Sequence, residues 1–206
     1  MKQQEKGTIY SPNSFTMVDG DLIKLAFKGE FDVIVHGCNC FCVQGAGIAW
    51  QMAKHFFTDD YKEGYTLEGI EYKGDINKLG NIQHVTYKVD TVKRQLMSSE
   101  EVKDAPNKTV TGYLNSPKVE SKELTVVNAY TQYYYGKNHI DGVDKPLNYQ
   151  ALRLCMKKVN KTFKGLTIGL PKIGCGLAGG SWRLVKSILK EELVDCNVII
   201  VNYKKQ

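Results

Sequence analysis

Long apolar runs are missing from this sequence. No stretch approaches the roughly 20 consecutive apolar residues that a membrane-spanning helix needs. The amino-terminal stretch "MKQQEKGTIYSPNSF" also lacks the apolar centre of a secretory signal. We therefore expect a cytoplasmic protein without membrane attachment, and we expect its six cysteines to be reduced thiols rather than disulfide bridges.

The sequence has no internal repeats, no low-complexity tracts and no single block of charge. Its 206 residues, 42% hydrophobic and 24% charged, predict one domain, spanning residues 1–206, with its own core. The net charge of +6 mildly favours acidic ligands such as phosphates. Lysines at 157–164 follow one helical stretch, which indicates a solvated helix face more than a nucleic-acid surface.

Strand-like and helix-like segments alternate along the chain. The β-branched run at 33–35 predicts a buried strand, and the apolar spacing of 48–56 predicts a helix. Further strands are expected at 78–89, 124–130, 166–170 and 197–203, and further helices at 147–163 and 181–193, the last with Ser181 as its cap. This alternation predicts a three-layer α/β/α sandwich around a mixed, mostly parallel sheet. The polar stretch 90–123 is expected to be a surface insertion that could include a small hairpin.

The segment "VIVHGCNCFCVQGAGIAW" alternates His36, Cys38, Cys40 and Cys42 with other residues. On a strand these four positions would span about 20 Å, which is too far for the ligands of one metal ion. A catalytic thiol would need a nearby base and a lowered pKa, and this alternative stays open. The favoured interpretation is that the cysteines are small buried side chains that fill space under a loop.

Two glycine-rich loops each follow a buried strand, "QGAG" at 44–47 and "GCGLAGG" at 174–180. Glycine allows close approach of the backbone to a ligand, and free N–H groups at a helix start attract anions. Each loop alone could be a tight turn. Two such loops at the carboxyl ends of strands in one sheet predict a cradle for a diphosphate. Neither loop has the Lys-Ser/Thr of a P-loop, and no dinucleotide-binding fingerprint is present.

At these motifs the sequence resembles the macrodomain family, which binds ADP-ribose. The resemblance covers most of the chain outside the first dozen residues and 90–123, through "GDLIKL", "VHGCNCFCVQGAGIA", "VVNAYTQ", "LPKIGCGLAGGSW" and "VIIVNY". Within the family, the pattern "HxCNC" followed by "GLAGG" resembles the branch of ADP-ribose 1''-phosphate phosphatases. The resemblance therefore implies ADP-ribose or its 1''-phosphate as ligand, with no metal and no cofactor.

The resemblance also implies a set of binding residues. Asp21 would accept a hydrogen bond from the adenine amino group, with the backbone N–H of Leu22 beside it, and Asn39 would hold the distal ribose hydroxyls. Tyr203 could stack on adenine or be an ordinary aromatic residue at a strand end. Backbone groups would contact the distal ribose and the phosphates in the first loop at Gly45, Ala46, Gly47 and Ile48. Backbone groups would wrap the diphosphate in the second loop at Gly174, Cys175, Gly176, Leu177, Ala178 and Gly179.

For the chemistry, the resemblance assigns His36 to the terminal phosphate, with Asn39 beside it. Imidazole suits this role because it titrates close to neutral pH, although a histidine at the end of a buried strand is often only a hydrogen-bonded core residue. Asp141 and Asp144 could approach the site, but they are more typical of surface loop acids. Tyr133–Tyr135 could cover the distal ribose or simply pack.

The sequence departs from the branch of macrodomain glycohydrolases that uses a lysine and an aspartate. Gln132 and Ala178 stand in the corresponding places, which weakens that mechanism. The expected activity is removal of the terminal phosphate of ADP-ribose 1''-phosphate. Two alternatives stay open: an ADP-ribosyl hydrolase that acts on modified protein or nucleic acid, and a reader that binds ADP-ribose without changing it.

Overall fold

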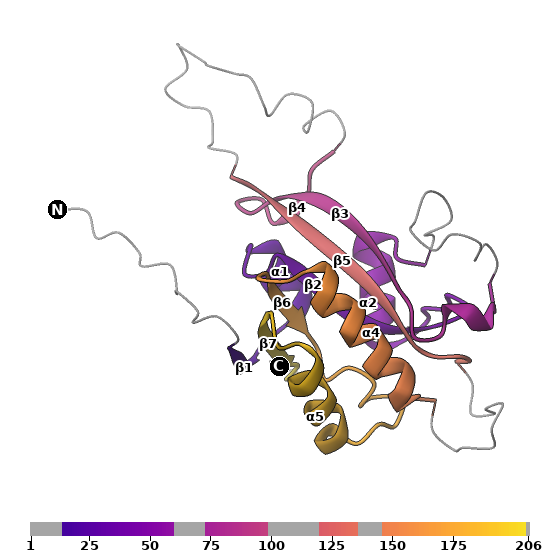
Figure 1. The fold of residues 1–206 in the computed structure, drawn as a ribbon. Coiled ribbons are helices and arrows are strands. Elements are labelled where there is room, and N and C mark those ends of the chain that lie inside the picture. Colours follow the sequence, from indigo (N-terminus) through magenta and orange to yellow (C-terminus); the bar gives the residue numbers. More distant parts are fainter. Residues whose placement is uncertain (1–13, 60–72, 99–119, 136–145, 205–206) are drawn as a thin grey trace, which may run out of the picture.

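A seven-stranded sheet runs through the centre of the protein (Figure 1). The structure, a computed structural model, describes residues 14–59, 73–98, 120–135 and 146–204. The strand order is β1-β7-β6-β2-β5-β3-β4. Neighbouring strands pair in parallel from β1 to β5, and β3 and β4 join in antiparallel pairs. The strands are β1 (Phe15–Asp19), β2 (Val33–Asn39), β3 (Ile82–Asp90), β4 (Gln95–Leu96), β5 (Ser121–Gln132), β6 (Thr167–Leu170) and β7 (Asn197–Asn202).

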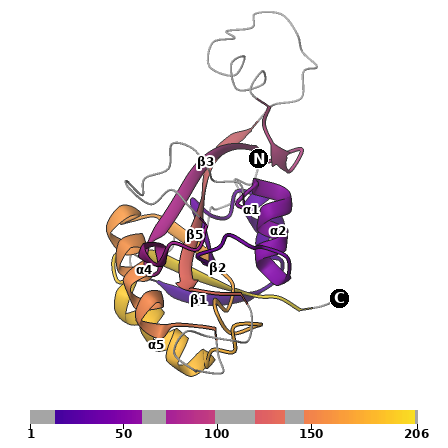
Figure 2. The same cartoon turned by 90° about the vertical axis from the view of Figure 1, so that its right-hand side faces the viewer.

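Helices cover both faces of this sheet, as the two cartoon views show (Figures 1 and 2). The apolar side chains of α1 (Leu22–Phe27) and α2 (Gly47–Phe56) form one core layer with the sheet. Those of α4 (Tyr149–Thr162) and α5 (Trp182–Glu192) form the core layer on the opposite face. A short 3₁₀ turn at Ile76–Lys78 precedes β3. The predicted three-layer sandwich with a mixed, mostly parallel sheet is confirmed.

The central strand β2 contributes side chains to both core layers. Val33 and Val35 pack with α4 and α5, whereas Ile34 packs with α1 and α2. Because successive side chains of a strand point to opposite faces, His36 continues on the side of Ile34 and Gly37 on the side of Val35. This alternation separates two neighbouring residues of the sequence motif into different layers of the protein.

The helices after the sheet strands begin where the sequence indicates, with one difference in capping. Asn148 caps α4, because its Oδ1 accepts a hydrogen bond from the Ala151 N–H at 2.8 Å. Ser181 occupies the predicted N-cap position of α5, but its side chain makes no capping hydrogen bond. Instead the Ser181 backbone N–H donates to the Tyr149 hydroxyl at 2.8 Å. The expected side-chain cap is therefore replaced by a contact between α4 and α5.

The polar stretch predicted as an insertion is partly strand. Asp90 ends β3 and Ser121 opens β5, and the two residues pair in the antiparallel ladder. At the start of the stretch, β4 pairs with the end of β3, with Asp90 opposite Gln95. Polar residues join these strands because backbone pairing with a neighbour, rather than hydropathy, extends a strand. The remainder of the stretch, residues 99–119, lies outside the described residues.

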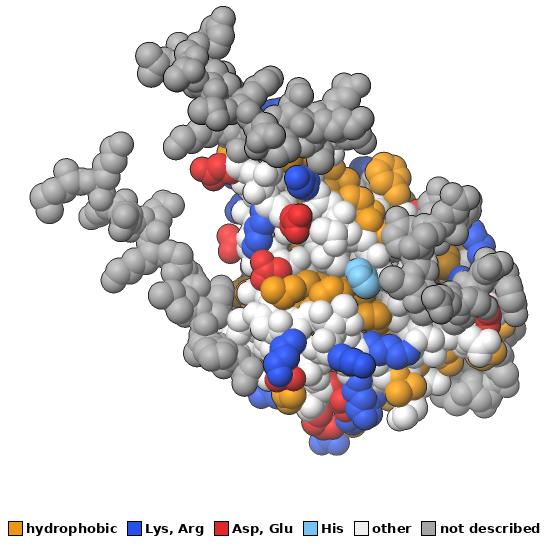
Figure 3. All heavy atoms as spheres, turned by 45° about the horizontal axis from the view of Figure 1, so that its top comes forward, with side chains coloured by type: hydrophobic (Ala, Val, Ile, Leu, Met, Phe, Trp, Pro, Cys, Tyr) orange, Lys and Arg blue, Asp and Glu red, His pale blue; other side chains and the backbone are white. Residues whose placement is uncertain are grey.

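The charged surface is mixed in sign. On the face shown in Figure 3, Lys and Arg side chains lie beside Asp and Glu side chains and do not form a continuous basic area. Lys164, for example, pairs with Asp195 at 3.3 Å. In the part of the chain that the structure describes, no helix is long and apolar enough to cross a membrane.

Candidate functional site

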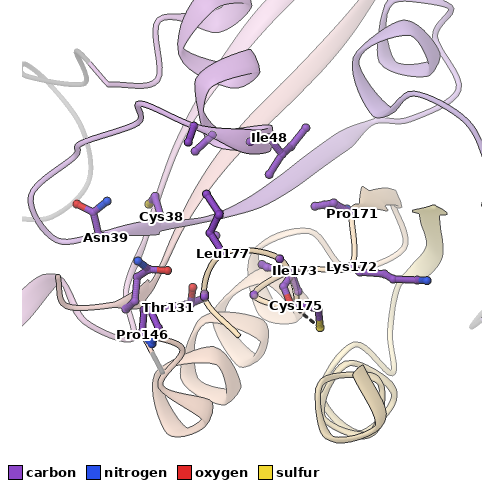
Figure 4. A pocket seen from close by; sticks show the side chains of 18 of the residues that line it. Cys38, Asn39, Ile48, Thr131, Pro146, Pro171, Lys172, Ile173, Cys175 and Leu177 are labelled. Carbon is purple, nitrogen blue, oxygen red and sulfur yellow. Dashed lines mark hydrogen bonds between the residues drawn. The ribbon is translucent and has the colours of Figure 1, made fainter. Parts of the chain in front are cut away.

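A cavity of about 590 Å³ opens at the carboxyl ends of β2, β5, β6 and β7 (Figure 4). Its volume lies in the range of small-molecule sites, roughly 300–1,000 Å³. Its position is the edge at which open α/β sheets bind ligands. Both glycine-rich loops line it, together with strand ends and a proline-containing segment: Gly37–Asn39, Val43, Gly45–Ala49, Thr131–Gln132, Tyr135, Pro146, Pro171–Ala178 and Val201–Tyr203.

The first glycine loop leads directly into α2. Ala46 is the N-cap of this helix in an extended conformation and provides no side-chain cap. The N–H groups of Gly47 and Ile48 donate to no acceptor among the described residues, as expected for a first helical turn. Gly47 has a φ of +59°, which favours glycine, and a Cβ on Gly45 would meet no atom within 4 Å. The loop therefore presents free donors and open space to the cavity.

The second glycine loop folds back on itself through backbone hydrogen bonds. The Gly179 N–H donates to the Gly176 carbonyl at 3.0 Å, and the Gly180 N–H donates to the Gly174 carbonyl at 2.8 Å. Within the described residues, four N–H groups of this loop have no acceptor: those of Gly174, Gly176, Leu177 and Ala178. Successive free N–H groups in a turn form a concave site for anions.

Two glycines of the second loop have different reasons to lack a side chain. Gly174 has a φ of +69°, and a Cβ there would lie 2.6 Å from Leu147 Cδ1. This position needs glycine for the fold. A Cβ on Gly176 would meet no atom within 4 Å. The absence of a side chain at Gly176, as at Gly45 in the opposite loop, leaves room in the cavity rather than relieving a clash within the protein.

Asn39 lines the cavity, but most of its hydrogen-bonding capacity supports the chain. Its Oδ1 accepts from the N–H groups of Phe41 at 3.0 Å and Val43 at 3.2 Å, and its Nδ2 donates to the Val43 carbonyl at 2.7 Å. These bonds close the turn that leads into the first glycine loop. Of the bonds described, they leave one amide hydrogen of Asn39 for a ligand. Its predicted contact with the distal ribose stays a prediction.

His36 does not line the cavity, although Gly37 and Cys38 next to it do. Its side chain is fully buried, and its Nε2 lies 2.5 Å from Asn128 Oδ1. Because Asn128 Nδ2 donates to a carbonyl, Oδ1 is the acceptor and Nε2 carries the proton. Burial lowers the pKa of His36 to about 4, and the hydrogen bond to Asn128 opposes only part of this change. The imidazole is therefore neutral near pH 7 and does not line the cavity, and its predicted role toward the terminal phosphate stays a prediction.

A buried network connects His36 to the first glycine loop instead. Asn128 Nδ2 donates to the Thr58 carbonyl at 2.8 Å. Gln44 Nε2 donates to the same carbonyl at 3.1 Å, and Thr58 Oγ1 donates to Gln44 Oε1 at 2.5 Å. All four residues are buried, and Gln44 directly precedes Gly45. A chain of buried hydrogen bonds therefore runs from His36 to the residue that precedes the first glycine loop.

Four of the six cysteines are buried, and Cys42 and Cys175 are half-buried. Cys38 and Cys40 form a small apolar cluster with Tyr130, and all six cysteines are free thiols. Burial raises the pKa of Cys38 well above its usual value and raises that of Cys40 to about 12. Cys175, which also lines the cavity, has its pKa raised by burial. A raised pKa disfavours the thiolate that nucleophilic chemistry needs, so the catalytic-thiol alternative gains no support. Among the described residues, no group of His, Cys, Asp or Glu side chains could hold a metal ion.

The predicted adenine contacts follow the two neighbouring strands β1 and β7. Tyr203 lines the cavity directly after β7 and is 69% exposed, so most of its surface is accessible to a ligand. Asp21 and Leu22 are not among the lining residues. Asp21 caps α1, because its Oδ1 accepts from the N–H groups of Ile23 and Lys24 at 2.9 and 3.0 Å. Its role toward adenine stays a prediction.

Some lining residues were not predicted from the sequence pattern. Thr131, Pro146 and Ile173 line the cavity, and Figure 4 shows Thr131 and Pro146 at the end where Asn39 lies. For Thr131, near the end of β5, and Ile173, shortly after β6, the position at a strand end was the available signal. All three tyrosines of the aromatic run contact the Phe41 ring, and Tyr135 also lines the cavity. The two candidate acids, Asp141 and Asp144, lie outside the described residues.

The described lining holds little charge. Among the described lining residues, Lys172 is the one with a charged side chain. Its ammonium lies 5.8 Å from the centre of the Trp182 ring, and in Figure 4 the side chain points away from the middle of the cavity. The described lining residues include no carboxylate and no histidine. Anion binding here would depend on backbone N–H groups, supplied by Gly47 and Ile48 on one side and the second loop on the other.

The sequence resembles one known protein along most of its length. No family model matches the chain. It is 28% identical over 191 residues to an uncharacterized 17.5 kDa protein from the tk-vs intergenic region of Enterobacteria phage T4, which covers 91% of this chain and 95% of that protein.

Similar solved structures share the fold over most of this chain. A protein of unknown function from Bacteroides thetaiotaomicron has a TM-score of 0.55 at 21% identity, covering 92% of this chain and 98% of that one. DarTG of Thermosipho africanus, in complex with ADP-ribose, has a TM-score of 0.54 at 17% identity, covering 92% of this chain and 41% of that one. A mutant macrodomain from Oceanobacillus iheyensis has a TM-score of 0.50 at 16% identity, covering 96% of this chain and 88% of that one. The chain thus has the macrodomain fold.

Proposed function

We propose that the cavity binds ADP-ribose. The observation that carries this proposal is the pair of glycine loops, in which Gly45 and Gly176 leave open space and neighbouring N–H groups are free. A diphosphate between the loops would receive hydrogen bonds from both sides. The proposal is further supported by the shared fold, since the DarTG structure of that fold is a complex with ADP-ribose.

The orientation of the ligand follows from the two ends of the cavity. Tyr203, with Asp21 near the end of the neighbouring strand β1, would hold the adenosine half. The diphosphate would lie between the two glycine loops. In Figure 4 the Leu177 side chain points from the second loop toward the first loop, where Ile48 lies. The distal ribose would then reach Asn39 and the end of β5.

The reaction we propose is hydrolysis of the terminal phosphate of ADP-ribose 1''-phosphate. Water would attack phosphorus, and the bond between phosphorus and the 1'' oxygen would break. Backbone N–H groups directed at the phosphate would stabilise the charge of the transition state. His36 would contribute by holding the first loop through Asn128, Thr58 and Gln44.

The second candidate is a reader that binds ADP-ribose without turnover. One observation favours it: the described lining residues contain no carboxylate and no histidine that could transfer a proton. Backbone donors and shape are sufficient for binding. The two candidates therefore differ in turnover and agree on the ligand.

The test combines calorimetric titration of ADP-ribose with phosphate release from ADP-ribose 1''-phosphate in the presence of a chelator. Gly176→Val, which would fill the open space in the second loop, is the matched variant. Binding and release by the wild type, both lost in the variant, would support the phosphatase. Binding without release would support the reader, provided that ADP-ribosylated protein and nucleic acid also release no ADP-ribose. If they do release it, the protein is an ADP-ribosyl hydrolase. Absence of ADP-ribose binding would refute the whole proposal.

A further inference from the structure

Thr131, near the end of β5, has a buried hydroxyl without a hydrogen-bond partner. The residue lines the cavity and is 1% exposed. Among the described residues, its Oγ1 has no hydrogen-bond partner. The backbone carbonyl of Thr131, in contrast, accepts a hydrogen bond from the Asn148 N–H at 2.9 Å. The unpaired hydroxyl therefore has no evident role in the fold, although buried polar groups are nearly always paired.

Thr131 also interrupts the regular pairing of the sheet. Cys38 of β2 pairs with Tyr130, and the next residue, Asn39, pairs with Gln132, so that Thr131 is passed over. The ladder between β5 and β3 ends at Ala129. This irregularity is a β-bulge, a feature that redirects a side chain and is frequent next to active sites.

The surroundings of the hydroxyl are apolar. A Cβ on Gly37 would lie 2.9 Å from Thr131 Oγ1 and 3.2 Å from Ile173 Cγ1. The hydroxyl therefore occupies space that exists because residue 37 has no side chain. Valine has the shape of threonine and would fill the same space without a buried polar atom, so packing alone gives no reason for a hydroxyl here.

We infer that Thr131 Oγ1 is a ligand-binding group of the cavity, which hydrogen-bonds an oxygen at the distal ribose. This inference rests on the proposed function. Thr131 lies at the same end of the cavity as Asn39 and Pro146 (Figure 4), the end that the distal ribose would reach. A threonine hydroxyl can donate and accept, so it suits a ribose hydroxyl or an oxygen of a group attached to that ribose. Because Thr131 lines the cavity, its side chain borders the space that a ligand would fill.

The test is the Thr131→Val variant, with Thr131→Ser as the matched control that keeps the hydroxyl. Binding of ADP-ribose is compared with binding of ADP, which has the diphosphate but lacks the distal ribose. In Thr131→Val we expect ADP-ribose affinity to fall about 10-fold to 100-fold, the range for loss of one hydrogen bond that leaves a partner unpaired. We expect ADP affinity to stay at the wild-type level and the thermal midpoint not to fall. Thr131→Ser should bind ADP-ribose nearly as the wild type does.

Several results would overturn the inference. Unchanged ADP-ribose affinity in Thr131→Val would show that the hydroxyl does not touch the ligand. An equal loss for ADP and ADP-ribose would indicate general damage to the cavity, and a lower thermal midpoint would indicate a structural partner for the hydroxyl. If the wild type binds no ADP-ribose, the proposed function itself fails, and the inference fails with it.

Discussion

The burial of His36 predicts a specific dependence of stability on pH. Its pKa is about 4 in the folded protein, against 6.5 for an exposed histidine, because burial disfavours the charged form. Above pH 6.5 the imidazole is neutral in both folded and unfolded chains, and its contribution to stability is fully present. As the pH falls below 6.5, the unfolded chain binds a proton that the folded protein does not, so the free energy of unfolding decreases. The loss is complete near pH 4 and amounts to about 3 kcal/mol, at about 1.4 kcal/mol per pH unit.

The measurement is urea unfolding at several pH values between about 7 and 4, for the wild type and His36→Gln. A glutamine amide can donate to Asn128 Oδ1 as the imidazole does, but it does not titrate. Burial also lowers the pKa values of His55 and His84, and these residues are present in both proteins. The difference between the two curves therefore isolates His36. The wild type should lose about 3 kcal/mol more than the variant over this range.

Parallel curves for the two proteins would refute this reasoning, because they would show that His36 titrates normally and is accessible to water. In that case His36 could reach a ligand. A direct role would also be indicated if His36→Gln kept full ADP-ribose affinity but lost all phosphate release. With the buried geometry, we expect that affinity and turnover change together, because both depend on the first glycine loop.

Other predictions concern the loops and the thiols. Gly176→Ala should weaken ADP-ribose binding and leave the free energy of unfolding within about 0.5 kcal/mol of the wild-type value. Gly174→Ala should lower the free energy of unfolding by about 1–3 kcal/mol, because residue 174 has a positive φ and a Cβ there would contact Leu147. Urea unfolding of both variants checks this. Thr58→Val leaves Gln44 Oε1 unpaired, so it should cost about 1–3 kcal/mol and speed amide exchange at residues 43–48. Iodoacetamide at neutral pH should not reduce ligand binding or any turnover, because burial raises the pKa of the cavity thiols, Cys38 and Cys175. Inactivation by iodoacetamide would support the catalytic-thiol alternative.

Much of the fold is local in origin and was predictable. The β-branched run at Val33–Val35 forms β2, and the apolar spacing after Gly47 forms α2. The two glycine loops follow buried strands, as their sequence contexts predict. These features depend on periodicity and on backbone freedom at glycine, which act within a few residues. The edge strands β1 and β4 were not predictable in this way, because β4 is two residues long and β1 depends on pairing with β7.

The sequence by itself determined the class of fold, the two glycine loops and the alternation of side chains along β2. Only the tertiary structure decided which side of that strand faces the cavity, because this depends on the strand order and on the helices that cover each face of the sheet. For this reason His36, the most conspicuous residue for chemistry, lies in a buried network, whereas its neighbour Gly37 lines the cavity. The same applies to Thr131, because a bulge between β2 and β5 exists only once the two strands pair. Residue type and spacing predict what a side chain can do, and packing decides what it can reach.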